Sequence, residues 1–403
     1  MANRQILQLG TKRGPRRLMW QAGLLLCTAT AACGQAATKA VSTSALPFTV
    51  HEVAKFSTPW AMAFLPGSGV RLTGAALLTE KEGKLWLVDT ASGKRQAVAG
   101  VPQVHVAGQG GLGDVVVHPD FAGNRRVYLS FVEKGAGGSG AALGYGTLEM
   151  GKGAPRLTGF RTIWRQSPKV SGNGHFSHRI AFGPDGMLYL SSGDRQKMEP
   201  AQATDGHLGK VLRLTPEGAP APGNPWASKG GIAASFWTMG HRNVLGLSFA
   251  PDGRLWMSEM GPKGGDELNL SVAGKNYGWP VVSNGSHYED KDIPDHRPGD
   301  GFEAPKVWWN PAISPGGLII YSGNRFPGWK GDALIPALSG EALIRVDVRG
   351  ATATKAEQWP MNERIRGVDE GPDGSVYVIE DGRGGGGGRL LRLDPVRGSQ
   401  RRR

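Results

Sequence analysis

Short runs of alternating apolar and polar residues recur along the chain, each following a turn rich in Gly, Pro and Asp. Six such units are present: EGKLWLVD from Glu82, HPDFAGNRRVYLSF from His118, GPDGMLYLSSGD from Gly183, APDGRLWMSEMG from Ala250, KGDALIPAL from Lys330 and GPDGSVYVIEDG from Gly371. Proline presets φ and glycine accepts positive φ in these turns, while a run with a period of two suits a half-buried strand. The pattern predicts a chain of repeated turn and strand units.

The spacing of the units indicates the architecture. The intervals between them are 42, 61, 67, 78 and 43 residues when these positions are taken as equivalent: Leu85, Val127, Leu188, Leu255, Ala333 and Val376. Repeats of this size, each with about four strands, indicate a propeller, because one blade cannot bury both of its faces alone. We therefore predict an all-β fold, a six-bladed β-propeller, with the longest loops and the function in the middle blades. An irregular array of β-sandwiches is the alternative.

Composition and charge narrow the possible partners. The chain has 403 residues with 63 Gly, 27 Pro and 39% hydrophobic residues, which favours many tight turns over disorder. The formal net charge is +13, but only +4 remains on the body once the basic residues of the two tails are set aside: Arg4, Lys12, Arg13, Arg16, Arg17, Arg397, Arg401, Arg402 and Arg403. No RNP, helix-turn-helix or zinc-finger signature accompanies the charge, so we expect no nucleic-acid partner.

Residues 1–37 read as a targeting segment. A basic region through Arg17 precedes the apolar run LMWQAGLLLCTATAA, which has the length of a signal-peptide core and is short for a membrane span. The sequence Thr-Ala-Ala-Cys ending at Cys33 resembles a lipoprotein box, so the chain could be anchored through a lipidated Cys33. Cleavage by an ordinary signal peptidase near Ala31 or Ala37 is the alternative. Either reading predicts export to the periplasm.

The remainder of the chain reads as one domain with a tail. A linker of small residues leads into a propeller domain predicted at 47–394, and a basic tail follows at 395–403. Both cysteines, Cys27 and Cys33, lie in the targeting segment, so we expect a domain without disulfides.

Two polar motifs in the first half of the chain could carry chemistry. Gln109 lies in the Gly-rich stretch GQGGLGD, which has no P-loop lysine or following helix and so does not predict a nucleotide site. The motif GNGHFSHRIAFGPDG places His175 and His178 one turn and strand before Asp194, and a histidine held near a carboxylate can act as a general base. The absence of G-x-S-x-G and H-E-x-x-H argues against acyl transfer and zinc hydrolysis. A turn residue and two structural histidines are the alternatives.

A third set of residues could bind an anion. Arg242 and Asn243 precede the strand of the fourth unit, and Arg364 and Arg366 alternate in ERIRGV, so their side chains should point to one face of a strand. Three guanidinium groups together would suit a polyanionic ligand. A solvated strand face is the alternative.

Taken together, these residues resemble the glucose/sorbosone dehydrogenase family, the soluble aldose sugar dehydrogenases that depend on pyrroloquinoline quinone (PQQ). The most specific motifs, in the family's order, are GQGGLGDVVVHPDF, GHFSHRIAFGPDG, GKVLRL, GHRN, SEMGPKGGDELN, NYGWP and RIRGV. The resemblance extends from about Pro47 to Asp394 and implies a six-bladed propeller, in agreement with the repeats. It also implies oxidation of an aldose at its anomeric carbon to a lactone, with electrons passed to an external acceptor.

The resemblance assigns roles to particular positions. It implies that His175 is the catalytic base, oriented by Asp194, and that PQQ is held by Gln109, Arg242, Asn243, Arg364 and Arg366. It further implies a Ca²⁺ ion bound by the backbone carbonyls of Gly261 and Pro262, and a second calcium site at Glu267 and Tyr277. Hard cations prefer such oxygen ligands.

Three positions depart from the family pattern. Ser339 lies near the position of a PQQ-binding lysine, Val244-Leu245 replaces Pro-Gln after GHRN, and Met260 replaces a residue that is often polar. These differences leave two alternatives to a sugar dehydrogenase. One is a propeller that has lost catalysis and binds a sugar or an envelope partner. The other is a calcium-dependent lactonase, which would not need the arginines.

Overall fold

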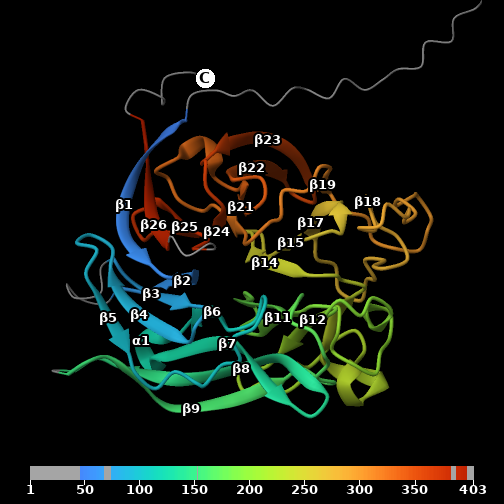
Figure 1. The fold of residues 1–403 in the computed structure, drawn as a ribbon, viewed down its shortest axis with the longest axis horizontal. Coiled ribbons are helices and arrows are strands. Elements are labelled where there is room, and N and C mark those ends of the chain that lie inside the picture. The colour runs from blue at the N-terminus through green and yellow to red at the C-terminus, as the bar shows by residue number, and fades with distance from the viewer. Residues whose placement is uncertain (1–45, 68–73, 152, 383–386, 397–403) are drawn as a thin grey trace, which may run out of the picture. The chain divides into compact units, whose positions relative to one another are not determined.

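The computed structural model describes residues 46–67, 74–151, 153–382 and 387–396. In this part of the chain, six four-stranded antiparallel sheets form six blades, and Figure 1 shows the blades following one another around a ring. The predicted all-β, six-bladed propeller is confirmed. The predicted targeting segment with Cys27 and Cys33, and the tail from residue 397, lie outside the described residues.

Each blade is an antiparallel meander of four strands. Blades one to three consist of β2 (Pro59–Phe64), β3 (Ala75–Glu80), β4 (Lys84–Asp89) and β5 (Arg95–Val98); β6 (Leu112–Val117), β7 (Arg126–Gly135), β8 (Gly138–Glu149) and β9 (Arg156–Arg165); and β10 (Ser177–Phe182), β11 (Leu188–Ser192), β12 (Lys210–Leu214) and β13 (Phe236–Met239). Blades four to six consist of β14 (Val244–Phe249), β15 (Leu255–Glu259), β17 (Asp266–Leu270) and β19 (Val307–Trp309); β20 (Ile319–Ile320), β21 (Ala333–Ala337), β22 (Ala342–Arg349) and β23 (Thr352–Pro360); and β24 (Ile365–Glu370), β25 (Val376–Glu380), β26 (Gly388–Pro395) and β1 (Phe48–Phe56).

The ring is closed by the two ends of the domain. The strand β1 pairs with β26 from Phe48 opposite Pro395 to Phe56 opposite Gly388, so the first strand of the chain is the outer strand of the sixth blade. The first strands of neighbouring blades contact each other in sequence, and β24 contacts β2. A closed ring leaves no blade without neighbours, so every blade buries both faces.

The hydrophobic core is divided among the interfaces between blades. Six buried clusters lie mainly between neighbouring blades, and in the first of them Leu77 of β3 packs with Val127 and Leu129 of β7. Leu78, the next residue after Leu77, belongs to the cluster between blades six and one. The second strands are therefore buried on both faces, and our prediction that these runs form half-buried strands is wrong for them, because each blade lies between two others.

The P-D-G stretches form turns followed by strands, as predicted, and they join the first strand of a blade to the second. In three blades the glycine that ends the turn has positive φ and donates its N–H to the residue three positions earlier: Gly186 to Gly183, Gly253 to Ala250 and Gly374 to Gly371. The aspartate in each turn accepts a backbone N–H from two residues further on. Local turn chemistry thus sets where these strands reverse.

The prediction is wrong for the first repeat unit, whose reference residue lies in the third strand of its blade and not in the second. Val127, Leu188, Leu255, Ala333 and Val376 all lie in second strands, whereas Leu85 lies in β4, the third strand of blade one. The equivalent of Val127 is Ala76, because Ala76 pairs with Phe64 as Val127 pairs with Val117. The turn before Leu85 resembles the others in composition but joins β3 to β4.

Helical structure is confined to short segments in the described residues. They are α1 (Phe121–Asn124), η1 (Glu199–Ala201), η2 (Ala227–Lys229), η3 (Gly231–Ser235) and η4 (Pro327–Trp329). A long connection between β17 and β19 contains β18 (Gly285–Ser286), which pairs with β16 (Lys263–Gly264). Long loops thus do lie in a middle blade. None of the helices in the described segments is long and apolar enough to cross a membrane.

Candidate active site

One cavity collects residues that begin or precede the first strand of every blade. Its volume is about 670 Å³, and the six blades in order contribute Trp60, Gln109, His175, Asn243, Ser314 and Arg364, among others. Of the predicted site residues, the cavity is lined by Gln109, His175, Arg242, Asn243, Gly261, Pro262, Arg364 and Arg366. The fold therefore brings together residues that are up to 257 positions apart, from Gln109 to Arg366.

A buried histidine and aspartate pair lies at the wall of this cavity. His175 Nδ1 is 2.7 Å from Asp194 Oδ1, because His175 precedes β10 and Asp194 follows the paired strand β11. Asp194 is completely buried, and its Oδ1 also accepts the backbone N–H of Gln196 at 2.8 Å. The remaining oxygen, Oδ2, accepts the indole N–H of Trp279 at 2.8 Å. Three donors thus fix the position of this carboxylate.

The environment of His175 keeps its imidazole neutral. Burial is the main cause that lowers the pKa of His175 below 6.5, the hydrogen bond to Asp194 opposes this shift, and the charge of Arg242 adds to it. A neutral ring that donates from Nδ1 to a carboxylate carries its lone pair on Nε2. In the described part of the protein, Nε2 has no hydrogen-bond partner. Gln109 Oε1 accepts the backbone N–H of His175 at 2.7 Å, which fixes the residue in its positive-φ conformation.

Arg242 and Asn243 are held by hydrogen bonds to neighbouring backbone and side-chain groups. Arg242 Nη1 donates to the carbonyl of Met260 at 3.1 Å, and Nη2 donates to the hydroxyl of Tyr288 at 3.1 Å. No carboxylate forms an ion pair with this guanidinium within the described residues, although Arg242 is only 5% exposed. Asn243 Oδ1 accepts from the backbone N–H and the hydroxyl of Ser177. Arg242 therefore brings a buried positive charge to the cavity without an ion-pair partner among the described carboxylates.

The other two arginines share one aspartate. Arg364 Nε is 3.1 Å from Asp381 Oδ2, and Arg366 Nη2 is 3.3 Å from Asp381 Oδ1. Arg364 precedes β24 and Arg366 lies within it, yet both reach the cavity, as their alternation predicted. Both positive charges keep the pKa of Asp381 below its usual range despite burial. Arg366 Nε is buried without a hydrogen-bond partner in the described chain.

His178, the other histidine of the motif, is structural. Its ring stacks on Trp60 at 5.2 Å between centroids, and its Nδ1 lies 2.7 Å from the hydroxyl of Ser130. Burial is the main cause that lowers the pKa of His178 to about 3, so it stays neutral over the physiological range. These contacts fit the alternative that His178 is a structural residue.

Two backbone carbonyls at the cavity suit a hard cation. Gly261 and Pro262 line the cavity together with Asp266, and the carbonyls of Gly261 and Pro262 accept no hydrogen bond from the described residues. A Cβ atom at Gly261 would lie 2.3 Å from the carbonyl oxygen of Gly265, so only glycine fits this turn. Asp266 accepts backbone N–H groups from Gly261, Ile313 and Ser314, which fixes the turn. The donor set therefore fits a calcium ion.

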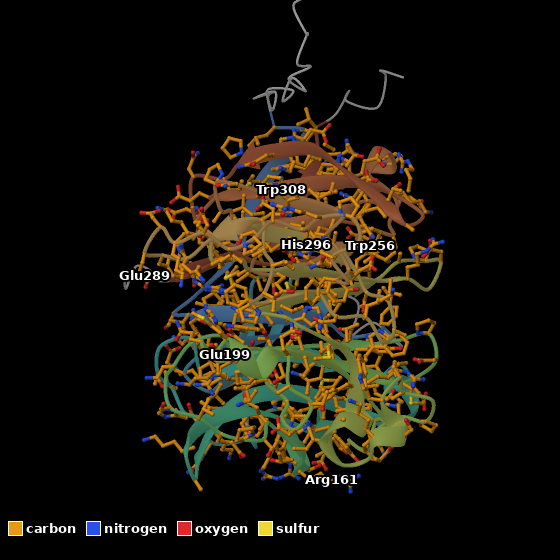
Figure 2. All side chains as sticks on the ribbon, turned by 90° about the vertical axis from the view of Figure 1, so that its right-hand side faces the viewer. Arg161, Glu199, Trp256, Glu289, His296 and Trp308 are labelled. Carbon is orange, nitrogen blue, oxygen red and sulfur yellow. The ribbon has the colours of Figure 1, made fainter. Side chains whose placement is uncertain are left out.

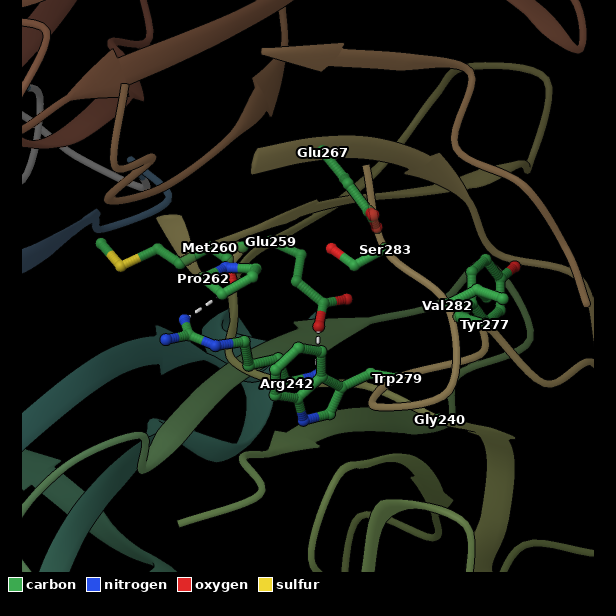
Figure 3. A pocket seen from close by; sticks show the side chains of 11 residues that line it. Gly240, Arg242, Glu259, Met260, Pro262, Glu267, Tyr277, Trp279, Val282 and Ser283 are labelled. Atoms are coloured by element: carbon green, nitrogen blue, oxygen red, sulfur yellow. Dashed lines mark hydrogen bonds between the residues drawn. The ribbon is translucent and has the colours of Figure 1, made fainter. Parts of the chain in front are cut away.

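Glu267 lies at a second, much smaller cavity of about 10 Å³, which is large enough for about one water or ion (Figure 3). Glu267 pairs directly with Glu259 across β15 and β17, and both line this cavity. Burial and then the charge of Glu259 raise the pKa of Glu267 to about 8. Glu259 already accepts from His241 Nδ1 at 2.8 Å, and a cation in this buried space would offset the remaining repulsion between Glu259 and Glu267.

Tyr277 can contribute to this second site only through its backbone. Its hydroxyl donates to the carbonyl of Leu270 and accepts the N–H of Val272, while its ring stacks on His241 at 4.7 Å between centroids. The side chain is therefore part of the core between blades three and four. The backbone carbonyl of Tyr277 is the oxygen that remains for a metal.

Comparison with known proteins identifies the family. The family model for glucose/sorbosone dehydrogenases matches residues 56–392. This chain belongs to the glucose/sorbosone dehydrogenase family. The aldose sugar dehydrogenase YliI of Escherichia coli is 38% identical over 348 residues, covering 85% of this chain and 91% of that protein. Quinoprotein glucose dehydrogenase B of Acinetobacter calcoaceticus is 28% identical over 412 residues, covering 82% and 84% of the two chains.

Solved structures agree with this assignment. The apo-form of the Escherichia coli aldose sugar dehydrogenase has a TM-score of 0.80 at 36% identity and covers 87% of this chain and 100% of its own. The PQQ-bound aldose sugar dehydrogenase of Streptomyces coelicolor has a TM-score of 0.72 at 29% identity and covers 88% of this chain and 99% of its own. The fold of the family is thus present along almost the entire described domain.

The departures from the glucose/sorbosone dehydrogenase pattern fall in different places. Leu245 and Met260 line the large cavity and make part of its wall apolar. Ser339 does not line it, because its hydroxyl contacts the hydroxyl of Ser314 at 2.8 Å and the carbonyl of Ala312. Lys81, on the turn between β3 and β4, does line the cavity and adds a cationic side chain that the motifs did not indicate.

Sequence reasoning missed two aromatic residues of the site. Trp279 belongs to the NYGWP motif, but nothing in that motif indicates a hydrogen bond to Asp194. Tyr288 lies in the long connection of blade four, where no periodicity distinguishes it, and it is 66% exposed at the cavity. Both come from a loop whose path is set by tertiary contacts.

Proposed function

We propose that this protein is a PQQ- and calcium-dependent dehydrogenase that oxidises aldose sugars at the anomeric carbon to lactones. The observation that carries the proposal is the buried pair of His175 and Asp194 beside a cavity with three arginines. A base with a free Nε2 and an array of cations are what this reaction requires of the protein. The names of the Escherichia coli and Streptomyces coelicolor relatives support the same activity.

Five side chains would hold PQQ, a planar cofactor with several carboxylates. Arg242 and Arg366 suit carboxylate binding because both guanidinium-bearing side chains line the cavity, and Arg242 has no ion-pair partner among the described carboxylates. Arg364 adds charge beside them, and Gln109 and Asn243 add amide groups. When bound, PQQ supplies the two-electron acceptor of the reaction.

His175 would take the proton from the anomeric hydroxyl. Its Nε2 is unprotonated because burial lowers the pKa of the ring and Nδ1–H is donated to Asp194. The charge of Asp194 stabilises the imidazolium that forms, and the complete burial of Asp194 keeps water from competing for that hydrogen bond. The protein's own contribution to catalysis is thus a fixed base of one tautomer.

Calcium would be bound at two places. The carbonyls of Gly261 and Pro262 would hold an ion that supplies positive charge at the cavity. Glu267, Glu259 and the carbonyl of Tyr277 would hold a second ion that is structural, because it would neutralise two buried carboxylates. Both sets consist of the oxygen ligands that calcium prefers.

Export is proposed from the sequence of residues 1–37, and the two alternatives for this segment remain a lipid anchor at Cys33 and ordinary cleavage. A periplasmic location would give the enzyme access to external sugars. An external electron acceptor would then complete each turnover.

Reconstitution tests the proposal. The purified mature protein is loaded with PQQ and Ca²⁺, and dye reduction is followed across a panel of aldoses, with His175→Ala in parallel. Sugar-dependent reduction that requires both additions and is lost in His175→Ala is the expected result. Failure to bind PQQ at saturating concentration would refute the proposal and favour a binding module without catalysis.

A further inference from the structure

The carboxylate of Asp194 is held from two sides. Oδ1 accepts from His175 Nδ1 at 2.7 Å, whereas Oδ2 accepts from the indole Nε1 of Trp279 at 2.8 Å. Trp279 is 6% exposed and does not line the large cavity. The indole therefore lies behind the pair of His175 and Asp194, away from the space where a substrate would enter.

Trp279 is itself fixed by several contacts. Its backbone N–H donates to the carbonyl of Gly240 at 3.0 Å, and its carbonyl accepts from Gln202 Nε2 at 2.7 Å. Its ring lies 5.5 Å from the guanidinium carbon of Arg242, and Figure 3 shows the two side chains next to each other. The indole N–H is thus aimed at Asp194 by a rigid environment, and the same ring supports an arginine of the cavity.

We propose that Trp279 is a positioning residue for the base. Its indole N–H fixes the carboxylate of Asp194 and, through it, the tautomer and orientation of His175, while its ring supports Arg242. This inference rests on the proposed function for the role of His175 as the base. Partners of this kind, one contact behind the reacting group, commonly decide its orientation and basicity.

Loss of the indole donor has a predictable direction. A carboxylate with one donor fewer offers more of its negative charge to the remaining ones, so it stabilises the protonated imidazole more strongly. The charged groups that act on His175 are Asp194, which favours the protonated ring, and Arg242 and Arg195, which oppose it. Trp279→Phe leaves all three charges in place, so the pKa of His175 should rise.

The test is a titration of the histidine ring in the full mature chain without added cofactor. Histidine labelled with nitrogen isotope is followed by NMR in the wild type and in Trp279→Phe, which keeps an aromatic ring and removes the N–H. We expect an upward shift of the His175 midpoint by roughly 0.5–1 unit, the size expected for one altered hydrogen bond to a charged group. An unchanged midpoint and unchanged ring signals would overturn the proposal.

Trp256→Phe is the matched control. Trp256 lies in β15 and is fully buried, and its indole nitrogen has no hydrogen-bond partner in the described residues (Figure 2). The same change of volume there removes a donor that bonds to nothing, so the His175 midpoint should stay at its wild-type value. A shift of equal size in both variants would show a general packing effect and overturn the proposal.

A measurement on the wild type covers the case in which Trp279→Phe does not fold. Because Trp279 and His175 donate to the same carboxylate, the indole resonance of Trp279 should change with pH at the midpoint of His175. Absence of any indole resonance with that midpoint would overturn the proposal.

Kinetics of the loaded enzyme give a second readout. Trp279→Phe should lower kcat/KM roughly 3- to 10-fold and move its acid limb to higher pH, with PQQ affinity changed less than about twofold because the ring remains. A large loss of PQQ affinity with an unmoved acid limb would contradict the role assigned here. These outcomes can be told apart from those for the proposed function. A shifted His175 midpoint in a protein that reduces no dye would support the contact of Trp279 with His175 through Asp194 and would refute the dehydrogenase activity.

Discussion

Asp194→Asn should remove most of the activity and leave the propeller folded. The carboxylate faces three donors and no acceptor, namely His175 Nδ1–H and the Gln196 N–H at Oδ1 and Trp279 Nε1–H at Oδ2. An amide has one oxygen and one NH₂ group, so in either orientation its NH₂ group meets at least one of these donors.

The two orientations have different consequences. If the amide oxygen faces His175, the NH₂ group faces the indole, and the unmade hydrogen bonds lower the free energy of unfolding by about 1–3 kcal/mol. If the amide is turned, its NH₂ group faces His175, which must then carry its proton on Nε2 and cannot accept another there. Both orientations remove the negative charge that stabilises the imidazolium. We therefore expect kcat to fall about 100- to 10,000-fold.

The pH dependence of kcat/KM in Asp194→Asn should shift in a defined direction. Asp194 raises the pKa of His175 against the effect of burial, so its charge loss lowers that pKa further. The base is active when neutral, so the acid limb of kcat/KM in Asp194→Asn should move to lower pH. Dye reduction at saturating PQQ and Ca²⁺ over a pH series measures both quantities. Asp252→Asn, at an exposed turn between β14 and β15, is the control and should keep the wild-type rate. A wild-type kcat in Asp194→Asn, or a limb moved to higher pH, would refute the reasoning.

Three further predictions concern binding and stability. Arg366→Met should weaken PQQ binding about tenfold to a hundredfold, because a charge-assisted contact is lost; fluorescence titration of the apoprotein measures it, and an unchanged Kd would contradict it. In Glu267→Gln, Ca²⁺ should raise Tm by less than it does in the wild type. An equal rise in both proteins would show that Ca²⁺ does not bind at Glu267. Arg179→Met should lower the free energy of unfolding by about 3–5 kcal/mol and Tm by roughly 10 °C, because Asp114 is then buried without a countercharge. Adding Asp114→Leu should restore part of this stability, and no restoration would contradict that cause.

The blade architecture could be predicted because local turn sequences mark the repeat units. Pro-Asp-Gly turns such as that ending at Gly186 reverse the chain in three blades, and together with three turns of related composition they gave the six repeat units that indicated six blades. The same reasoning misplaced Leu85, since a turn of similar composition joins any two antiparallel strands. Only pairing partners, such as Phe64 for Ala76, distinguish the first hairpin of a blade from the second.

The candidate site was only partly predictable, and two histidines of one motif show why. His175 and His178 lie three residues apart in one motif, both have positive φ, and both line the cavity in the structure. Trp60 of blade one stacks on His178, whereas Asp194 binds His175. No local pattern reports which neighbour a blade will present to each ring.

The sequence by itself determined the repeated units, their number, and the residue types that gather before each first strand. The tertiary structure decided which of these residues meet. It placed Asp381 between Arg364 and Arg366, Glu259 opposite Glu267, and the indole of Trp279 behind Asp194. The physical reason is that turn chemistry and side-chain periodicity act over a few residues, whereas these contacts arise from strand register, loop paths and the packing of neighbouring blades in a closed ring.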